Sequence, residues 1–309
     1  MRWLVAAFAL AFPAALAAQA NTPSAPTACT VPAGWDDILA QNPRFVVLGE
    51  WHGTNEAPGF VANLLCAEAA RGQRLLLAVE HGAIYNPAWQ AAWALPHDDF
   101  RAALPDLGWR RREDGVASEA MLALVLGAHA LKQQGARVDI VAFNGARDDA
   151  QKARFADLPG QGPHEAAQAE NIADAAARKD YDRVIVLVGS LHAEIAPVTV
   201  GNPAAAFAPM AMRLAGYGSV ISLDMQHAGG TSWSCRTRPD VTLNPGEPVT
   251  DEMIRCAAYA HKPDASHSRP PFIDISQTAA KASGGRYHGV FWVGAITASP
   301  PALPPDLRQ

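Results

Sequence analysis

The sequence lacks several features that would point to common classes of protein. It has no basic stripe, since 25 Lys and Arg residues are spread among 30 Asp and Glu residues for a net charge of −5. This balance argues against nucleic acid or an anionic membrane as a partner. No Gly-x-Ser-x-Gly motif is present, which argues against a hydrolase with a serine nucleophile. The four cysteines are scattered without a Cys-x-x-Cys pair, which argues against a zinc–cysteine site.

Long apolar runs are also missing after the N-terminus, so no membrane span is predicted. The first residues instead predict a secretory signal: Arg2 is followed by the apolar run Trp3–Leu16 and by the cleavage site Ala18-Gln19-Ala20. The alternative, an uncleaved anchor, is disfavoured because the run is short and contains Pro13. Residues 1–20 are therefore predicted to be a signal peptide without a lipobox, and the mature protein to be periplasmic or secreted.

Cysteines in an exported chain favour disulfides, because oxidising compartments stabilise them. Four cysteines allow three pairings. We favour Cys235–Cys256, which bracket a short turn-rich segment, and Cys29–Cys66, which flank the first predicted strand. The alternative is that they are free, buried cysteines that pack as small hydrophobic side chains.

The order of apolar runs predicts the fold class. After a Pro-containing lead-in at residues 21–43, runs typical of buried strands alternate with helical stretches. This alternation predicts a single α/β domain over residues 44–309, with a mostly parallel central sheet flanked by helices and an irregular, disulfide-bearing insertion at 228–286 before the last strand. The predicted strands are 44–49, 75–80, 138–143, 184–189, 219–223 and 290–295, and the main helices are 59–70, 118–134 and 163–179.

Polar residues follow most of the predicted strands. Two of these strands end in Gly-x-x-His turns, Gly49–His52 and Gly189–His192, and Glu80 ends the strand between them in the sequence. In parallel sheets, ligands bind beyond the carboxyl ends of the strands, so these residues are predicted to share a site. Imidazole and carboxylate can either hold a divalent metal or activate water.

Each of these features also has a purely structural interpretation. A lone Gly-x-x-His turn is often an ordinary loop. Glu80 and Glu56 could be acidic residues near helix N-termini, where the helix dipole favours them. The recurrence of the turn after two separate strands, with Glu80 between them, favours a shared functional site over this interpretation.

Three segments resemble a known superfamily. They are FVVLGEWHGTNE at 45–56, LLLAVEH at 75–81 and VIVLVGSLHAE at 184–194. They are similar to the superfamily of erythromycin esterases, ChaN-type haem-binding proteins and TIKI/TraB-type metalloproteases, whose members share paired Gly-x-x-His motifs with an intervening Glu. The spacing in Glu50-Trp51-His52 is closer to the ChaN and TIKI pattern than to that of the esterases, which usually have one more residue between the Glu and the His.

The resemblance implies a catalytic or ligand-binding cluster and two alternative functions. The first is an exported hydrolase that activates water against an ester or amide of a small molecule or peptide, with His52 as the base and His192 binding a metal or stabilising charge. The second is a ChaN-type haem- or iron-binding protein with a histidine or Tyr85 as axial ligand. The oligomeric state is left open. The cluster consists of Glu50, His52, Glu80 and His192; the residues suggested to bind a divalent metal are His52, Glu80 and His192; the secondary candidates are Glu56, His81, Glu119 and Asn144.

Overall fold

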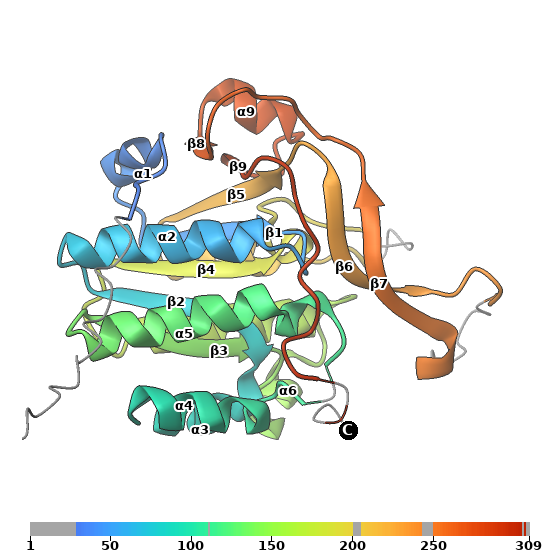
Figure 1. Cartoon of the computed structure of the whole chain (residues 1–309), viewed down its shortest axis with the longest axis horizontal. Coiled ribbons are helices and arrows are strands. Elements are labelled where there is room, and N and C mark those ends of the chain that lie inside the picture. The colour runs from blue at the N-terminus through green and yellow to red at the C-terminus, as the bar shows by residue number, and fades with distance from the viewer. Residues whose placement is uncertain (1–28, 111, 200–204, 243–249, 305, 307–309) are drawn as a thin grey trace, which may run out of the picture.

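A seven-stranded sheet forms the centre of the protein (Figure 1). The structure, a computed structural model, describes residues 29–110, 112–199, 205–242, 250–304 and 306. The strand order is β3-β2-β4-β1-β5-β9-β8, and only β8 runs antiparallel to its neighbour. The predicted fold class, a single α/β domain with a mostly parallel sheet, is therefore confirmed. The strands are β1 (Phe45–Glu50), β2 (Leu75–Gly82), β3 (Val138–Asn144), β4 (Arg183–Gly189), β5 (Val220–Gln226), β8 (Phe272–Asp274) and β9 (Gly289–Trp292).

The central strands are buried on both faces. In β1, Val46 and Leu48 pack into one hydrophobic core, whereas Phe45 and Val47 pack into the other. Side chains of a strand alternate between its faces, so a strand covered on both sides needs apolar residues at every position. This is why β1 and β4 read as continuous apolar runs in the sequence.

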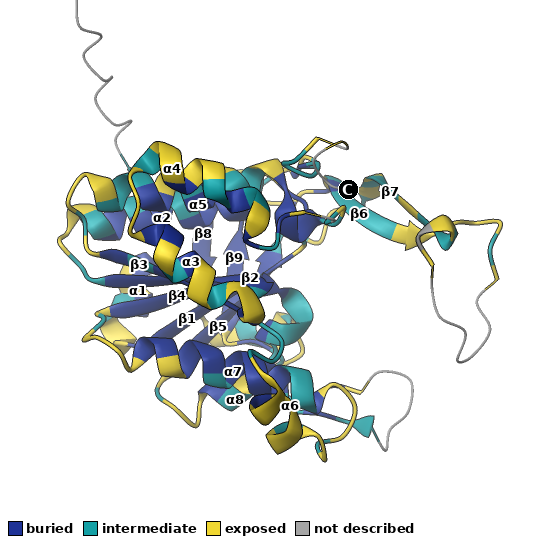
Figure 2. Cartoon of the chain, turned by 90° about the horizontal axis from the view of Figure 1, so that it is seen from below, coloured by how far each residue is buried: buried dark blue, intermediate teal, exposed yellow. Residues whose placement is uncertain are grey.

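Helices cover each face of the sheet (Figure 2). The chain leaves β1 for one face and leaves its neighbour β4 for the other, so a crevice between their carboxyl ends is expected. The first face carries α2 (Glu56–Ala70), α3 (Asn86–Trp93), α4 (His97–Ala103) and α5 (Glu119–Gln133); the second carries α6 (Asp149–Phe155), α7 (Gly162–Ala176) and α8 (Met210–Leu214). Short 3₁₀ helices include η1 (Ala83–Tyr85), η2 (Leu104–Asp106), η3 (Gly115–Ala117), η4 (Ser190–Ala193) and η6 (Asp251–Met253).

The insertion at 228–286 contains more regular structure than its sequence indicates. It includes the hairpin of β6 (Gly230–Thr237) and β7 (Ile254–His261), the edge strand β8 and α9 (Gln277–Ala282). The hairpin projects from the side of the body where the parallel strands end (Figure 1). Its strands are solvated along most of their length, so they lack the apolar run that marks a buried strand.

Two disulfides are present, Cys29–Cys66 and Cys235–Cys256, the two pairings that the sequence favours. The first joins the start of the described chain to α2, and the second joins directly opposed residues of the hairpin. The lead-in contains the helix α1 (Trp35–Gln41), which docks on α2 where Trp35 donates a hydrogen bond to Glu68.

The predicted signal peptide, residues 1–20, lies outside the described residues. Within the described part, no helix combines the length and apolar character needed to cross a membrane.

Candidate functional site

The first Gly-x-x-His turn folds His52 back over the end of the sheet. Its Nδ1 lies 2.9 Å from Glu50 Oε1, and its Nε2 lies 3.3 Å from Glu80 Oε2. Glu80 comes from β2, which is separated from β1 by β4. Its carboxylate reaches across β4, where Gly189 N–H donates a hydrogen bond of 2.8 Å to Oε2. Both ring nitrogens of His52 therefore face a carboxylate.

The second turn holds His192 differently. Its Nδ1 lies 2.7 Å from Glu165 Oε1, whereas its Nε2 is 3.7 Å from Glu80 Oε1, which is too long for a hydrogen bond. Glu165 is fully buried near the start of α7, and its other oxygen accepts a hydrogen bond from Met210 N–H. The site is thus an alternating chain of five side chains: Glu50, His52, Glu80, His192 and Glu165.

The glycines of the two turns make this arrangement possible. A Cβ on Gly189 would lie 2.8 Å from His52 Nε2, and a Cβ on Gly49 would lie 2.7 Å from the Cβ of Ala193. Glu50 pairs with Gly189 in the sheet, so each turn packs directly against the other. Each glycine is needed because the opposite turn occupies the space that a side chain would fill.

The two imidazoles reach solvent while the carboxylates lie beneath them. The side chains of His52 and His192 are 28% and 16% exposed, whereas those of Glu50 and Glu165 are 1% and 0% exposed. The histidines are therefore the more accessible groups of the cluster, and the buried glutamates contact them from within the protein.

Carboxylates on both sides stabilise the charged form of His52. Burial alone would lower its pKa, but Glu80 and Glu50 outweigh burial and raise the pKa well above 6.5. Burial likewise opposes ionisation of Glu80, but His52, His192 and the Gly189 N–H lower the pKa of Glu80 to about 2. Both shifts favour an ion pair between the imidazolium of His52 and the carboxylate of Glu80.

The pKa values of His192 and Glu50 are also raised. Burial opposes the charge of His192, but its contact with Glu165 and the charge of Glu80 raise its pKa above 6.5. Burial raises the pKa of Glu50 despite the nearby His52. A proton bound to His192 is thus held more tightly than in free imidazole, which makes neutral His192 a stronger base.

The secondary candidates lie outside this chain of contacts. Glu56 accepts hydrogen bonds from Thr297 N–H and Oγ–H, and Glu119 is exposed at the start of α5. His81 is buried and stacked on Trp109, and burial lowers its pKa to about 3. His81 is therefore a neutral core residue in this arrangement.

Asn144, the fourth secondary candidate, connects to the site indirectly. Its Oδ1 accepts a hydrogen bond of 2.9 Å from Gln168, which also lies 2.9 Å from Nε2 of His164. The sequence analysis named none of His164, Glu165 and Gln168 as a site residue. No local signal distinguishes Glu165, since acidic residues are common in the first turn of a helix.

The three suggested metal ligands lie together, but the donor atoms of His52 and Glu80 already contact each other or neighbouring groups. Both nitrogens of His52 face carboxylates, and the oxygens of Glu80 face His52, His192 and the Gly189 N–H. In the described part of the chain, no group of three or more His, Cys, Asp or Glu side chains could hold a metal ion. We therefore derive no step through a metal.

The suggested haem ligand, Tyr85, lies in η1 after β2 and is 44% exposed. A Cβ built on Gly108 would lie 2.9 Å from its ring, so the ring packs against that glycine. No hydrogen bond or ring contact of the described residues joins Tyr85 to His52 or His192.

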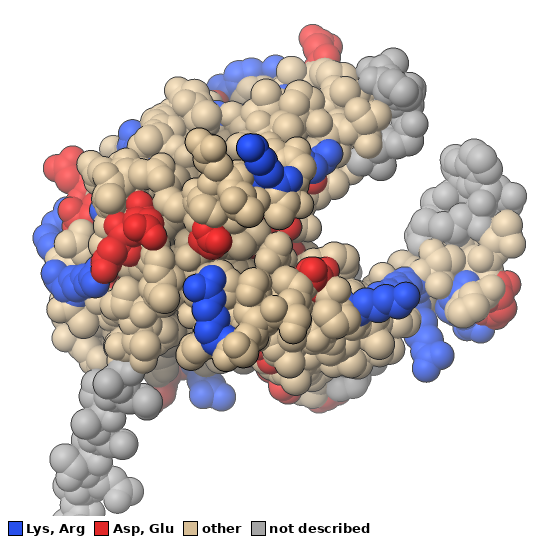
Figure 3. Space-filling view, turned by 90° about the horizontal axis from the view of Figure 1, so that it is seen from above, with Lys and Arg blue, Asp and Glu red and all other residues tan. Residues whose placement is uncertain are grey.

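Trp51 and the hairpin border the site. The Trp51 indole is 43% exposed, and its ring centroid lies 4.9 Å from that of His261 on β7. Strand β6 is attached to the His52 turn, because Trp233 N–H donates a hydrogen bond of 2.8 Å to Gly53 O. Figure 3 shows a hollow between the projecting hairpin and the body on this side of the molecule.

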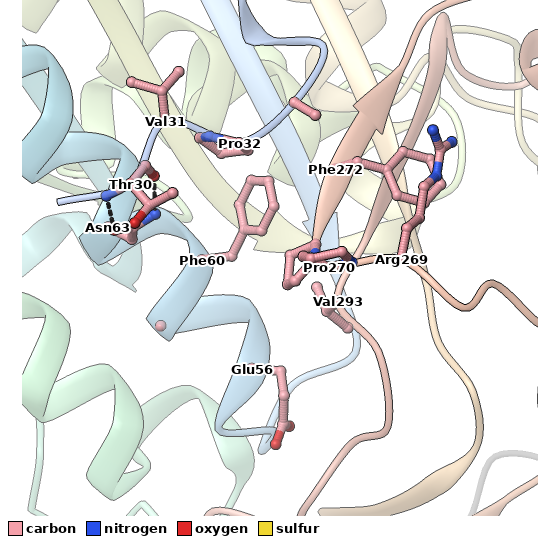
Figure 4. Close-up of a pocket in the computed structure, with 13 residues that line it drawn as sticks. Thr30, Val31, Pro32, Glu56, Phe60, Asn63, Arg269, Pro270, Phe272 and Val293 are labelled. Carbon is pink, nitrogen blue, oxygen red and sulfur yellow. Dashed lines mark hydrogen bonds between the residues drawn. The ribbon is translucent and has the colours of Figure 1, made fainter.

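An apolar cavity of about 690 Å³ lies elsewhere, along α2 (Figure 4). Phe60, Phe272 and Val293 line it, and Thr30 and Asn63 hydrogen-bond to each other at its edge. None of the five residues of the His–Glu chain lines this cavity, so it is a separate feature from the site.

Comparisons with known proteins support the fold. No protein-family model matches the chain, and no curated protein matches it significantly. A mutant of the erythromycin esterase EreC in its open conformation is similar, with a TM-score of 0.55, 13% identity, and coverage of 85% of this chain and 94% of that one. The resemblance inferred from the motifs is thus confirmed as a shared fold.

Two further solved structures are similar at lower scores. The type III effector HopBA1 has a TM-score of 0.42 and 12% identity, with 82% of this chain and 87% of that chain covered. ChaN of Campylobacter jejuni, solved with cofacial haem, has a TM-score of 0.36 and 12% identity, with 62% of this chain and 85% of that chain covered.

Proposed function

We propose that the protein is a hydrolase that activates water with His192 and stabilises the developing negative charge with His52. The observation that carries this proposal is the chain Glu50–His52–Glu80–His192–Glu165, whose two imidazoles are partly exposed. Histidines oriented by buried carboxylates are a common basis of general base catalysis. The EreC likeness shows the fold alone and is compatible with this reaction class.

The different contacts of the two histidines support these roles. His192 donates from Nδ1 to Glu165, so its neutral form has a lone pair on Nε2, which no carboxylate approaches within hydrogen-bond distance. His52 has a carboxylate at each ring nitrogen, which favours the imidazolium. The assignment reverses the roles inferred from the sequence, where His52 was the base.

The reaction then proceeds as an ordinary hydrolysis. Water gives a proton to His192 Nε2 while its oxygen bonds to the carbonyl carbon of an ester or amide, and the carbonyl oxygen becomes negative. The positive charge of His52 stabilises that oxygen. When the tetrahedral intermediate collapses, the leaving group takes the proton from His192. The substrate is a small molecule or peptide, and the disulfides suit an oxidising compartment outside the cytoplasm.

Hydrolysis of p-nitrophenyl acetate and of alanine p-nitroanilide across pH tests the proposal. His192 must be neutral and His52 charged, so the rate should rise and then fall with pH. The midpoints of the rising and the falling limb should both lie above pH 6.5. His192→Ala should reduce the rate by about 10²–10⁴-fold, whereas His267→Ala, which alters an exposed histidine outside the cluster, should not.

Dialysis against EDTA should leave the rate unchanged, because no step uses a metal. An active, folded His192→Ala variant, or a rising limb well below pH 6, would contradict the proposed role of His192.

A further inference from the structure

We propose that His164 is a third catalytic histidine, which donates a hydrogen bond from Nδ1 to the carbonyl oxygen of the substrate. The inference rests on the proposed hydrolase function and adds a residue that the sequence analysis did not name. His164 lies in the first turn of α7, directly before Glu165. Its ring centroid is 5.7 Å from that of His192, with the planes inclined by 44°. It therefore stands beside the proposed base.

A hydrogen-bond network determines which nitrogen of His164 carries the proton. Gln168 Nε2 lies 2.9 Å from both Asn144 Oδ1 and His164 Nε2. An amide NH₂ group only donates, so Nε2 of His164 must accept. The single proton of the neutral ring is then on Nδ1.

His164 also stays neutral over the pH range in which His192 gains or loses its proton. Burial, followed by the positive charge of His192, lowers the pKa of His164, while Glu165 and Glu80 oppose this shift. A second proton would place an N–H of the ring against the NH₂ group of Gln168. His164 is therefore a neutral donor that does not compete with His192 for the proton of water.

The Nδ1 edge of His164 lies beside Gly145, a residue without a side chain. Gly145 follows β3 with φ +73°, and a Cβ there would lie 3.7 Å from Nδ1 and 3.6 Å from Cε1. His164 is partly exposed, and among the described residues no hydrogen bond or ion pair of Nδ1 is found. The N–H is thus free for an oxygen of a ligand at the carboxyl edge of the sheet.

The role of this donor is electrostatic. The carbonyl oxygen of the substrate gains negative charge when water attacks, so its hydrogen bond to Nδ1–H strengthens in the transition state. The proton remains on His164 throughout, while His192 receives the proton of water and passes it to the leaving group.

Three substitutions separate this role from a structural one, with p-nitrophenyl acetate as the probe. The amide nitrogen of Asn can take the place of Nδ1, whereas the amide of Gln reaches the position of Nε2 and preserves the contact with Gln168. We expect His164→Asn to retain most of kcat/KM, and His164→Gln and His164→Phe to lower it by about 10²-fold or more. All three variants should keep the pH of the rising limb above 6.5, because His192 sets it.

The reverse order, with Gln active and Asn inactive, would show that His164 only supports Gln168 and would overturn the inference. Wild-type activity in His164→Phe would overturn it as well. Long-range ¹H–¹⁵N spectra of the wild-type protein give a second test without any variant: we expect the proton on Nδ1 at neutral pH, and a proton on Nε2 refutes the donor role. An inactive His192→Ala beside an active His164→Phe would refute this inference alone, whereas an active His192→Ala would refute the proposed function.

Discussion

The two Gly-x-x-His turns have the same sequence pattern, yet they place their histidines in different electrostatic settings. His52 lies between two carboxylates at 2.9 and 3.3 Å, whereas His192 has one at 2.7 Å and another at 3.7 Å. The difference arises at Glu80, which lies between the two histidines, because its Oε2 is closer to His52 than its Oε1 is to His192. A repeated motif therefore need not mean a repeated role: one histidine is held as a cation, and the other has a free nitrogen.

The largest expected effect comes from removing both histidines. Each of His52→Ala and His192→Ala should lower the rate by about 10²–10⁴-fold, and the double variant should be little worse than either, because members of one catalytic unit are strongly non-additive. The rates with p-nitrophenyl acetate of the four proteins of this cycle, each checked by a melting curve, test this. Independent, multiplying losses would mean that the two turns do not act together.

Glu80 joins the two turns, and its ionisation should contribute to stability. Its pKa is about 2 in the folded protein, below the ordinary value of 4.5, so its contribution is complete above pH 4.5 and is lost as the pH falls toward 2. A shift of this size corresponds to at most about 3 kcal/mol. Urea unfolding between pH 2 and 6 should show this loss in the wild type and in Glu56→Gln, a carboxylate outside the cluster. A Glu80→Gln variant with the same pH dependence as the wild type would refute the coupling.

Replacing Gly49 or Gly189 with alanine should affect stability and activity to different extents. Gly49→Ala places a Cβ 2.7 Å from Ala193 Cβ and 3.1 Å from the backbone of Ser190, which should cost about 1–3 kcal/mol of stability. Gly189→Ala meets only the end of the His52 side chain, so it should reduce activity more than stability. Paired measurements of rate and unfolding free energy check this order, and a Gly189→Ala protein with wild-type activity would speak against the importance of the His52 position.

The smallest effects should come from the outer carboxylates. Glu165→Gln removes the charge beside His192 and should lower the pH of the rising limb, with a loss of about tenfold in kcat because the base becomes weaker. Glu50→Gln removes a charge beside His52 and should instead lower the pH of the falling limb. Full pH–rate profiles separate the two variants, and a shift of the same limb in both would contradict the division of roles.

Much of the fold could be predicted because buried strands produce continuous apolar runs in the sequence. Strands such as β1 and β4 are covered on both faces and must be apolar throughout. The hairpin β6–β7 and the short strand β8 lack a long apolar run, since the hairpin is largely solvated and β8 has only three residues. Their pairing depends on partners that are distant in the sequence or separated by a turn-rich segment.

The sequence by itself determined which residues arrive at the carboxyl edge of the sheet: Glu50, His52, Glu80 and His192 each follow or end a buried strand. Only the tertiary structure decided what those residues can do. Glu165 and Gln168 lie in α7, whose sequence is that of an ordinary helix. They reach the site because α7 packs on the second face of the sheet, against side chains of β4. Proton positions and charges depend on contacts of about 3 Å between such distant segments. No local pattern encodes them, because the energy of an ion pair or hydrogen bond depends on distance in space and on burial rather than on separation along the chain.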